Sequence, residues 1–219
     1  MRYNVQMAGV GGQGVLMASM VIGNAAMAEG MDVTMSEVHG MAQRGGGVIS
    51  TIRIGEDVIS PLIPKGGADL LLAFEPIEAC RSLEYANDET FIVTNTHPII
   101  PITVSMGDDS YPEIDDLIEA LMEVSDRVVP INATGMAAEA GGSIATNSVL
   151  IGAVAAVTGF PLSREELLDS LLAMVPQKFR RMNQRAFEMG FQATSRSIAV
   201  LERKPDRPSS SPNSYQSIQ

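Results

Sequence analysis

The feature that most constrains the fold is a glycine-rich turn close to the start of the chain. Arg2 to Ala8 has the pattern of a strand, Gly9 to Gly14 is a turn, and Val15 to Glu29 is a predicted buried helix. The stripe at helical spacing along this helix consists of Leu16, Met20, Gly23 and Met27. Met31 to Ser36 follows as a second strand. Because βαβ units have parallel strands, this start predicts an α/β fold.

The rest of the chain indicates a three-layer α/β/α domain with a mostly parallel, mixed sheet. Val48 to Ile54 is rich in β-branched residues, and Val58 to Ser60 is expected to return beside it as a hairpin partner. Asp69 to Phe74 is a continuous apolar run, typical of a central strand. Further strands are predicted at Thr90 to Thr94 and Arg127 to Ile131, and helices at Glu75 to Leu83, Ile114 to Met122, Ala133 to Ala140, Thr146 to Thr158, Ser163 to Ala173, Phe179 to Met189 and Phe191 to Arg203. We expect one folded domain over residues 1–203 and a disordered tail over residues 204–219.

Composition excludes several classes of function. The chain has 26 acidic and 15 basic residues, and this balance argues against a nucleic-acid partner. The only cysteine, Cys80, cannot form an internal disulfide or hold an iron–sulfur cluster or a zinc ion alone, and no metal-ligand spacing is present. The longest apolar run, Val149 to Val157, is too short to span a bilayer. Without a secretory signal, a cytoplasmic location and no membrane contact are expected.

The glycine-rich turn is a candidate anion site. A turn that opens a helix directs backbone N–H groups and the positive end of the helix dipole outward. Gly9, Gly11 and Gly14 match the dinucleotide pattern G-x-G-x-x-G, and Gly12 and Gln13 complete the set of candidate cofactor contacts. The alternative is that the glycines only permit a tight turn and close helix packing.

A nicotinamide dinucleotide site would need an acidic residue about 20 residues further on to hold the ribose. Glu37 is suitably placed. However, the strand at Val48 to Ile54 follows where a dinucleotide fold would continue with a helix, and this difference counts against the dinucleotide interpretation.

The second candidate loop runs from Glu37 to Gly47. His39 can move a proton near neutral pH, and Arg44 is a fixed cation suited to a phosphate or carboxylate, so both are candidate catalytic groups. The candidate contacts to a cofactor, substrate or partner in this loop are Glu37, Gly40, Gln43, Gly45 and Gly46. The alternative is a flexible, solvated surface loop. Because both loops follow strands expected to be parallel neighbours, we expect them to meet at the carboxyl edge of the sheet.

Other polar residues have simpler interpretations. His97 is expected to make a local hydrogen bond, Cys80 to be a small buried residue, and Asn132 to cap a helix. Asn147 is either a helix cap or a contact to a cofactor, a substrate or a partner. The basic cluster Lys178, Arg180 and Arg181 is either a solvated face or a contact to an acidic partner or a coenzyme A phosphate.

Three motifs together resemble a known family. Gly9-Val-Gly-Gly-Gln-Gly14, Ser36-Glu-Val-His-Gly-Met-Ala-Gln-Arg-Gly-Gly46 and Asn183-Gln-Arg-Ala-Phe-Glu-Met-Gly190 resemble the gamma-type domain of 2-oxoacid:ferredoxin oxidoreductases. The second motif is most similar to the small subunits of the indolepyruvate branch. The resemblance covers roughly Arg2 to Arg196.

The resemblance implies a subunit of an enzyme that oxidatively decarboxylates a 2-oxoacid to an acyl-CoA and passes the electrons to ferredoxin. It implies thiamine diphosphate, iron–sulfur clusters and coenzyme A in the complex, with the thiamine and clusters on a larger partner subunit and no cofactor assigned to this chain alone. Two other functions remain open: a stand-alone NAD-dependent oxidoreductase, which would use Gly9, Gly11, Gly14 and Glu37, and a non-catalytic assembly subunit.

Overall fold

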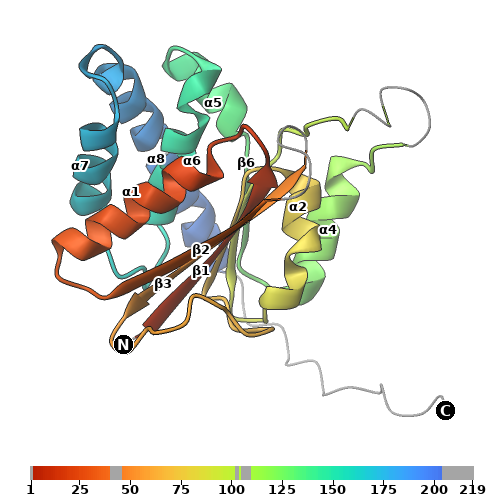
Figure 1. The fold of residues 1–219 in the computed structure, drawn as a ribbon. Helices are drawn as coiled ribbons and strands as arrows, with labels where there is room; N and C mark the ends of the chain where they lie inside the picture. Colours follow the sequence, from red (N-terminus) through yellow and green to blue (C-terminus); the bar gives the residue numbers. More distant parts are fainter. Residues whose placement is uncertain (1, 40–45, 102–103, 105–109, 204–219) are drawn as a thin grey trace.

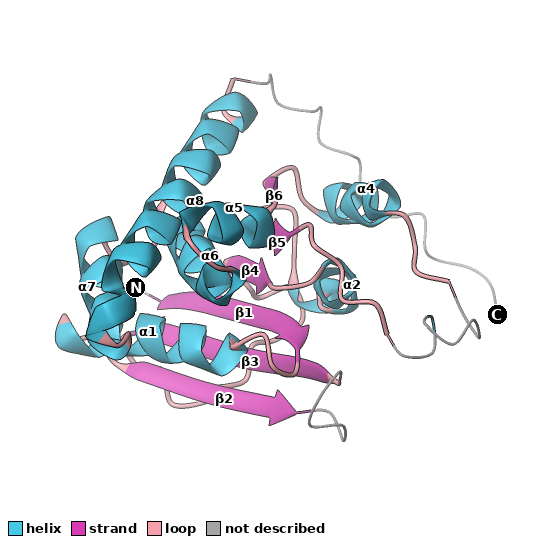
Figure 2. Ribbon diagram, turned by 90° about the horizontal axis from the view of Figure 1, so that it is seen from above, coloured by secondary structure: helices cyan, strands magenta, loops and turns pink. Residues whose placement is uncertain are grey.

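A six-stranded sheet with helices on both faces forms the framework of the molecule, as Figures 1 and 2 show. The structure is a computed structural model that describes residues 2–39, 46–101, 104 and 110–203. The strands are β1 (Arg2–Val10), β2 (Val33–His39), β3 (Gly47–Gly55), β4 (Leu70–Ala73), β5 (Phe91–Asn95) and β6 (Val128–Ile131), in the spatial order β2-β3-β1-β4-β5-β6. The expected three-layer α/β/α architecture is confirmed.

The sheet is mixed, as predicted, because β3 runs against its neighbours. β1, β4, β5 and β6 pair in parallel, whereas β3 pairs antiparallel with β1 on one side and with β2 on the other. The expectation that β1 and β2 are parallel neighbours was wrong, because β3 inserts between them. Because β3 runs antiparallel to both β1 and β2, these two strands point in the same direction and still end at the same edge of the sheet.

The predicted hairpin partner at Val58–Ser60 was also wrong, since these residues form no strand. The hydrogen-bonding capacity of β3 is used by β1 and β2, so no edge remains for another strand. Side chains of the sheet hold the segment instead: Thr34 donates to the Val58 carbonyl, and Arg53 Nη1 donates to the Ser60 carbonyl at 2.8 Å.

Among the residues that the structure describes, five longer helices lie on one face of the sheet and two lie on the other (Figures 1 and 2). The first group is α1 (Val15–Ala28), α5 (Ala133–Ala140), α6 (Thr146–Ala155), α7 (Arg164–Met174) and α8 (Arg180–Leu201); the second is α2 (Pro76–Arg81) and α4 (Ile114–Val124). Short 3-10 turns η1 (Leu83–Tyr85), η2 (Ser143–Ala145) and η3 (Gln177–Phe179) connect some of them. The predicted capping box at Ser163 starts α7, and Asn132 caps α5 by accepting from the Gly135 N–H.

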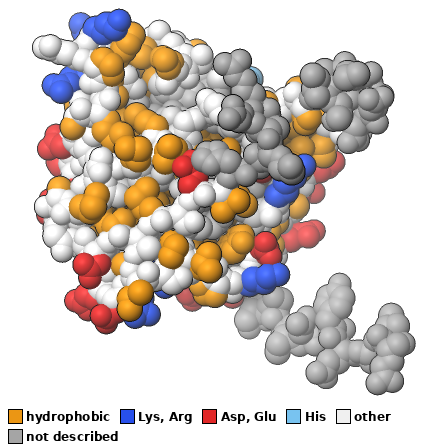
Figure 3. Space-filling view, viewed as in Figure 1, with side chains coloured by type: hydrophobic (Ala, Val, Ile, Leu, Met, Phe, Trp, Pro, Cys, Tyr) orange, Lys and Arg blue, Asp and Glu red, His pale blue; other side chains and the backbone are white. Residues whose placement is uncertain are grey.

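The α1 helix differs from the prediction in which side it buries. Leu16, Met20 and Met27 are 45%, 42% and 55% exposed, whereas only Gly23 of the expected stripe is buried. The sheet ends at β2, so the outer side of α1 has no neighbouring element in the described chain (Figure 2). The buried side of α1 packs against the sheet and against α7. Apolar side chains are accordingly visible over α1 in Figure 3.

Candidate functional site

The two glycine-bearing loops meet at the carboxyl edge of the sheet. The Gly11 N–H donates to the Gly46 carbonyl at 2.9 Å, and Val10 and Gly9 pair with Gly47 and Val48. The loops meet for a different reason from the expected one, which was direct parallel pairing of β1 with β2. β3 starts directly after the second loop and runs antiparallel to β1, so its first residue necessarily faces the last residue of β1.

Part of the second loop lies outside the described residues. The predicted contacts Gly40, Gln43, Arg44 and Gly45 belong to that part. Residues 204–219, for which a disordered tail is predicted, also lie outside the described residues. His39 is the last residue of β2, where its backbone pairs with Val48. The described part therefore brings Gly9–Gly14 together with Gly46, while the catalytic roles of His39 and Arg44 stay predictions.

Two glycines of the first turn are required by its geometry. Gly14 precedes α1 with φ +79°, a left-handed conformation that favours glycine, and a β-carbon there would lie 2.2 Å from Asn147 Nδ2. A β-carbon at Gly9 would lie 2.8 Å from Val15 Cγ2 and 2.9 Å from Phe74 Cβ. The turn is thus closely packed against α1, α6 and the end of β4.

The Gln13 side chain braces the turn from inside. Its Oε1 accepts from the Val10 N–H at 2.7 Å, and its Nε2 donates to the Phe74 carbonyl at 2.9 Å. The amide therefore joins the end of β1 to the end of β4 and fixes the path of the glycines. Gln13 therefore acts by holding the backbone of the turn in place.

Asn147 holds the same turn from a distant part of the sequence. Its Nδ2 donates to the Gly14 carbonyl at 3.2 Å, across 133 residues of chain. Asn147 lies in the first turn of α6 but does not cap that helix, which has no side-chain cap. Of the two interpretations of Asn147 from the sequence, the helix cap was therefore wrong.

A pocket of about 310 Å³ opens beside the first turn. Its lining residues are Gly12, Gln13, Gly14, Phe74, His97, Ile99, Thr134, Ser143, Ile144, Thr146 and Asn147. None of these lining residues is acidic. Gly14, the residue that precedes α1, and first-turn residues of α5 and α6 contribute to the wall, and the first turns of these three helices contain no acidic residue. Because helix N-termini carry partial positive charge, this wall favours an anionic group such as a carboxylate or phosphate.

Sequence reasoning missed His97, Thr134, Ser143 and Thr146 as parts of this wall. A signal for two of them was present, because His97 follows β5 and Thr134 follows β6 at the same carboxyl edge as the glycine turn. Ser143 and Thr146 could not be placed in this way, since their position depends on how α6 packs beside α1. His97 was expected to make only a local hydrogen bond, which it does through its backbone: its N–H donates to Asn95 Oδ1 at 3.4 Å.

Buried polar side chains under the pocket fix the strand ends. Asn95 Nδ2 donates to the Phe74 carbonyl at 3.2 Å and to Thr134 Oγ1 at 3.1 Å, and its Oδ1 accepts from the Ala133 N–H at 3.0 Å. Asn95 is 1% exposed. A single amide therefore ties the ends of β4, β5 and β6 together, so the floor of the pocket is rigid.

The buried carboxylate of Glu75 anchors the segment that follows β5. It accepts from the Tyr111 hydroxyl, from the Ile99 N–H at 3.3 Å and from the Glu78 N–H at 3.1 Å. Burial and this hydrogen bond raise the pKa of Tyr111 above its usual value. Since Ile99 lines the pocket, Glu75 positions one wall without lining the pocket itself.

Glu78 lies under the start of β3. Its Oε1 pairs with Arg81 Nη1 at 2.5 Å, and its Oε2 would lie 2.9 Å from a β-carbon at Gly47. Burial raises the pKa of Glu78, and Arg81 partly opposes that rise. This carboxylate therefore supports the end of the second loop from below.

Glu37 does not approach the glycine turn in the way that a dinucleotide site requires. Glu37 belongs to the edge strand β2 and pairs with Ser50 of β3, so β3 separates Glu37 from β1. Two strand spacings amount to about 10 Å, and Glu37 does not line the pocket. The ribose-binding acid and the phosphate-binding turn of that motif are therefore not brought together.

The remaining candidates are the thiol of Cys80 and the histidine, cysteine and acidic side chains that could bind a metal ion. Cys80 Sγ donates to the Leu117 carbonyl at 3.6 Å, and burial raises the pKa of its thiol. In the ranges that the structure describes, no group of three or more His, Cys, Asp or Glu side chains is arranged to hold a metal ion. Within the same ranges, no helix has both the length and the apolar composition needed to cross a bilayer.

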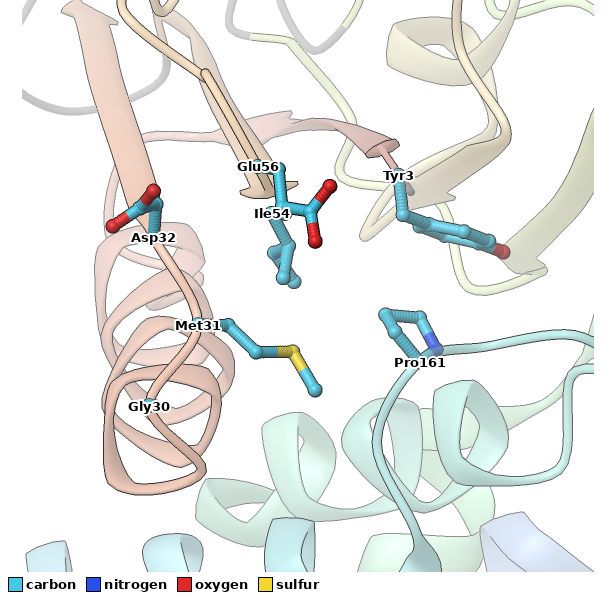
Figure 4. Close-up of a pocket in the computed structure, with 8 residues that line it drawn as sticks. Tyr3, Gly30, Met31, Asp32, Ile54, Glu56 and Pro161 are labelled. Carbon is cyan, nitrogen blue, oxygen red and sulfur yellow. The ribbon is translucent and has the colours of Figure 1, made fainter.

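A second pocket, of about 350 Å³, lies at the opposite edge of the sheet (Figure 4). Its lining includes Tyr3, Met31, Asp32, Ile54, Glu56 and Pro161. These residues come from the start of β1, the end of β3, the loop before β2 and the segment before α7, far from the carboxyl ends of the parallel strands. The two acidic residues disfavour an anionic ligand, so this pocket differs in chemistry from the one beside the glycine turn.

Comparison with known proteins gives a consistent result. A model of the pyruvate ferredoxin/flavodoxin oxidoreductase family matches residues 4–193. The chain is 44% identical to an indolepyruvate oxidoreductase subunit IorB of Methanothermobacter thermautotrophicus, over 90% of this chain and 100% of the relative. It is 42% identical to the subunit of the same name from Thermococcus kodakarensis, over 90% and 98%. The solved gamma subunit of a keto/oxoacid ferredoxin oxidoreductase from Geobacter sulfurreducens is 26% identical, with a TM-score of 0.63, over 88% of this chain and 98% of that chain.

Proposed function

Because the chain belongs to the pyruvate ferredoxin/flavodoxin oxidoreductase family, we propose that it is the small subunit of a 2-oxoacid:ferredoxin oxidoreductase. The substrate class is indolepyruvate and related arylpyruvates. The observation that carries the proposal is the identity of 42–44% to subunits named for indolepyruvate, across almost the whole of both chains. The enzyme would release CO₂ from the 2-oxoacid, transfer the acyl group to coenzyme A and pass the pair of electrons to ferredoxin.

The cofactors of such an enzyme divide between the chains. An iron–sulfur cluster needs several thiolates, and this chain has Cys80 alone. The residues present do not fit a cluster, so we assign the clusters to the larger partner subunit. Thiamine diphosphate, which stabilises the carbanion formed on decarboxylation, is assigned there as well.

This chain would contribute a wall to the shared active-site region. The pocket beside the first turn has no acidic lining residue and collects three helix N-termini, which fits an anionic group. Such a group is the carboxylate of the 2-oxoacid or a phosphate of coenzyme A or thiamine diphosphate. We propose that Gly12, Gly14, Thr146 and His97 orient it, and that Gln13 and Asn147 act by holding the turn.

Arg44 and His39 remain our candidates for direct action on the substrate. Arg44 precedes Gly46 by two residues in the sequence, and the Gly46 carbonyl accepts from the Gly11 N–H of the first turn. A guanidinium there would bind a carboxylate or phosphate. We expect Arg44→Ala to raise the KM for the 2-oxoacid or coenzyme A in the complex, or to weaken assembly with the partner; unchanged KM values and unchanged co-elution would contradict both roles.

One alternative has a specific observation in its favour. The Gln13 and Asn147 side chains are engaged with backbone groups of the turn, which also suits a non-catalytic assembly subunit whose loops only pack. A complex that keeps its kinetics when both loops are substituted would favour this alternative. The stand-alone NAD-dependent enzyme is disfavoured by the position of Glu37, and titration with NADH would test it directly.

The proposed function is tested by reconstitution. The purified chain is mixed with the purified larger subunit encoded by the same organism, and indolepyruvate- and coenzyme A-dependent reduction of ferredoxin or a viologen dye is followed. We expect activity from the mixture and none from either chain alone. Full activity of the small chain by itself, or no activity and no complex from the mixture, would contradict the proposal.

A further inference from the structure

A basic surface lies beside the anion-favouring pocket, and we propose that it is the docking surface for an acidic face of the partner subunit. It is formed by Lys178 of η3 and by Arg180, Arg181 and Arg185 at the start of α8, and is called the basic surface below; α8 also contacts η2, whose Ile144 lines the pocket. This inference rests on the proposed function, because it takes the partner to be the other subunit of the oxidoreductase.

The charge of the basic surface contrasts with that of the whole chain. The formal net charge is −11, yet residues 176–187 contain these basic residues and no acidic one. All of these basic side chains belong to exposed residues. Figure 3 shows Lys and Arg side chains gathered at the upper left, over the adjoining ends of α7 and α8 in the view of Figure 1.

The positions of these charges are unfavourable in the isolated chain. Arg180 and Arg181 are the first residues of α8, where the helix dipole is positive, and the first turn has no acidic residue. Arg181 and Arg185 are four residues apart, so their like charges lie on one side of the helix. Carboxylates from outside the chain would compensate for both effects.

No carboxylate in the described chain neutralises the basic surface. The described salt bridges join other pairs, such as Arg164 with Glu188 at 2.6 Å further along α8. Lys178 Nζ instead lies 4.8 Å from the centre of the Phe179 ring. The positive charge is therefore available to a partner, and charge complementarity of this kind steers association and sets specificity.

Apolar groups connect the basic surface to the pocket and indicate a protein partner. Ile144 is 77% exposed and also lines the pocket, and Phe179 is 37% exposed. Met182 of α8 lies against the turn before η2, where its Cγ would be 3.2 Å from a β-carbon at Gly141. Arginine and aromatic side chains around exposed apolar groups are typical of protein interfaces. A partner seated here would cover the mouth of the pocket and place it at the subunit boundary.

The test is a charge reversal at one end of α8 with a matched control at the other end. Arg180→Glu/Arg181→Glu changes the basic surface, and Arg196→Glu/Arg203→Glu makes the same change in net charge at exposed residues near the far end. Acidic residues suit the first turn of a helix, so the first variant is expected to keep its fold, which circular dichroism checks for both. Affinity for the larger subunit is measured by titration calorimetry at low and high salt.

We expect the first variant to bind the larger subunit at least about tenfold more weakly at low salt, with a reduced salt dependence. The control should bind within about twofold of the original chain, since surface charges far from the interface are screened. Equal affinity of the first variant and the original chain would overturn the proposed docking surface while leaving the proposed function intact.

Two further outcomes are distinguishable. A first variant that assembles normally but has a raised KM for the 2-oxoacid or coenzyme A would also overturn the docking proposal, because the basic surface would then bind a small anion. If the original chain forms no complex with the larger subunit at any salt concentration, the proposed function itself fails.

Discussion

At the scale of single residues, the site depends on backbone groups that a few side chains hold in place. Gln13 and Asn147 bond to the backbone of the first turn, and Asn95 joins three strand ends below it. The sequence identified the glycines and Gln13 because they form a motif. It did not indicate the bond between Asn147 and Gly14, because that contact requires α6 to pack beside α1.

Gly14→Ala tests this close packing. A left-handed alanine costs about 1–2 kcal/mol, and the added methyl would also displace the Asn147 amide from the Gly14 carbonyl. The matched control is Gly30→Ala, since Gly30 has a similar φ of +75° but no atom within 4 Å of the added β-carbon. In urea unfolding, Gly14→Ala should lose more free energy of unfolding than Gly30→Ala. Equal losses would show that Asn147 does not constrain the turn.

Thr146→Asp tests the anion-favouring wall by separating stability from function. An acidic residue in the first turn of α6 gains about 0.3–1 kcal/mol from the helix dipole, which offsets the loss of the hydrogen bond that Thr146 Oγ1 donates to the Ser143 carbonyl at 2.6 Å, so the free energy of unfolding should change little. The same carboxylate would line the pocket and repel an anionic ligand, so the KM for the 2-oxoacid or coenzyme A in the reconstituted complex should rise. Thr146→Asn, which is neutral, is the control and should change KM less. An unchanged KM in a stable, assembled Thr146→Asp variant would contradict an anionic occupant.

Glu78 gives a prediction for pH. Burial raises its folded pKa above the unfolded value, so its contribution to stability is fully present below the unfolded pKa and is lost as pH rises through the folded pKa. Glu78→Gln does not titrate at this position. The free energy of unfolding of the variant relative to the original chain should therefore increase as pH rises from acid to neutral. Because Arg81 lowers the pKa of Glu78, Arg81→Gln should enlarge the pH dependence. If the difference in free energy of unfolding between Glu78→Gln and the original chain stays constant across this pH range, the raised pKa of Glu78 is refuted.

At the scale of helices and strands, the sequence predicted which elements form better than how they pack. The strands at residues 69–74, 90–94 and 127–131 and the helix after Ser163 were identified because apolar runs and capping residues are local signals. The segment from Phe179 to Arg203 was expected to form two helices that divide at Gly190. The structure has one helix, α8, and Gly190 lies inside it because α6 crosses there at very short distance.

Gly190→Ala tests the crossing of α6 and α8. A β-carbon at Gly190 would lie 1.9 Å from the Val149 carbonyl oxygen, so the two backbones would have to separate. We expect a loss of about 2–3 kcal/mol in the free energy of unfolding. Gly23→Ala in α1 is the control: its β-carbon would lie close to the flexible Met35 side chain and at an ordinary contact distance of 3.7 Å from Val33 Cγ1, and the gain in helix propensity of about 1 kcal/mol offsets the adjustment. A Gly190→Ala variant as stable as the control would refute the close crossing.

At the scale of the whole molecule, the carboxyl edge of the sheet gathers the features that the proposed function needs. The sequence predicted that both glycine-bearing loops lie at this edge, but it assigned the wrong neighbour to β1 because the direction of β3 depends on pairing between distant segments. The pocket wall and the basic surface were not predicted as one region, since they combine the N-terminal ends of α1, α5 and α6 with the start of α8.

The central claim is that this edge, and not the opposite one, meets the larger subunit. Hydrogen–deuterium exchange of the chain, alone and in the complex, tests it most directly. We expect new protection on assembly at residues 10–17, 46–48, 143–147 and 177–185, with little change at residues 30–32 and 54–56 around the second pocket. Protection confined to the second pocket, or no change at the carboxyl edge in an assembled and active complex, would contradict it.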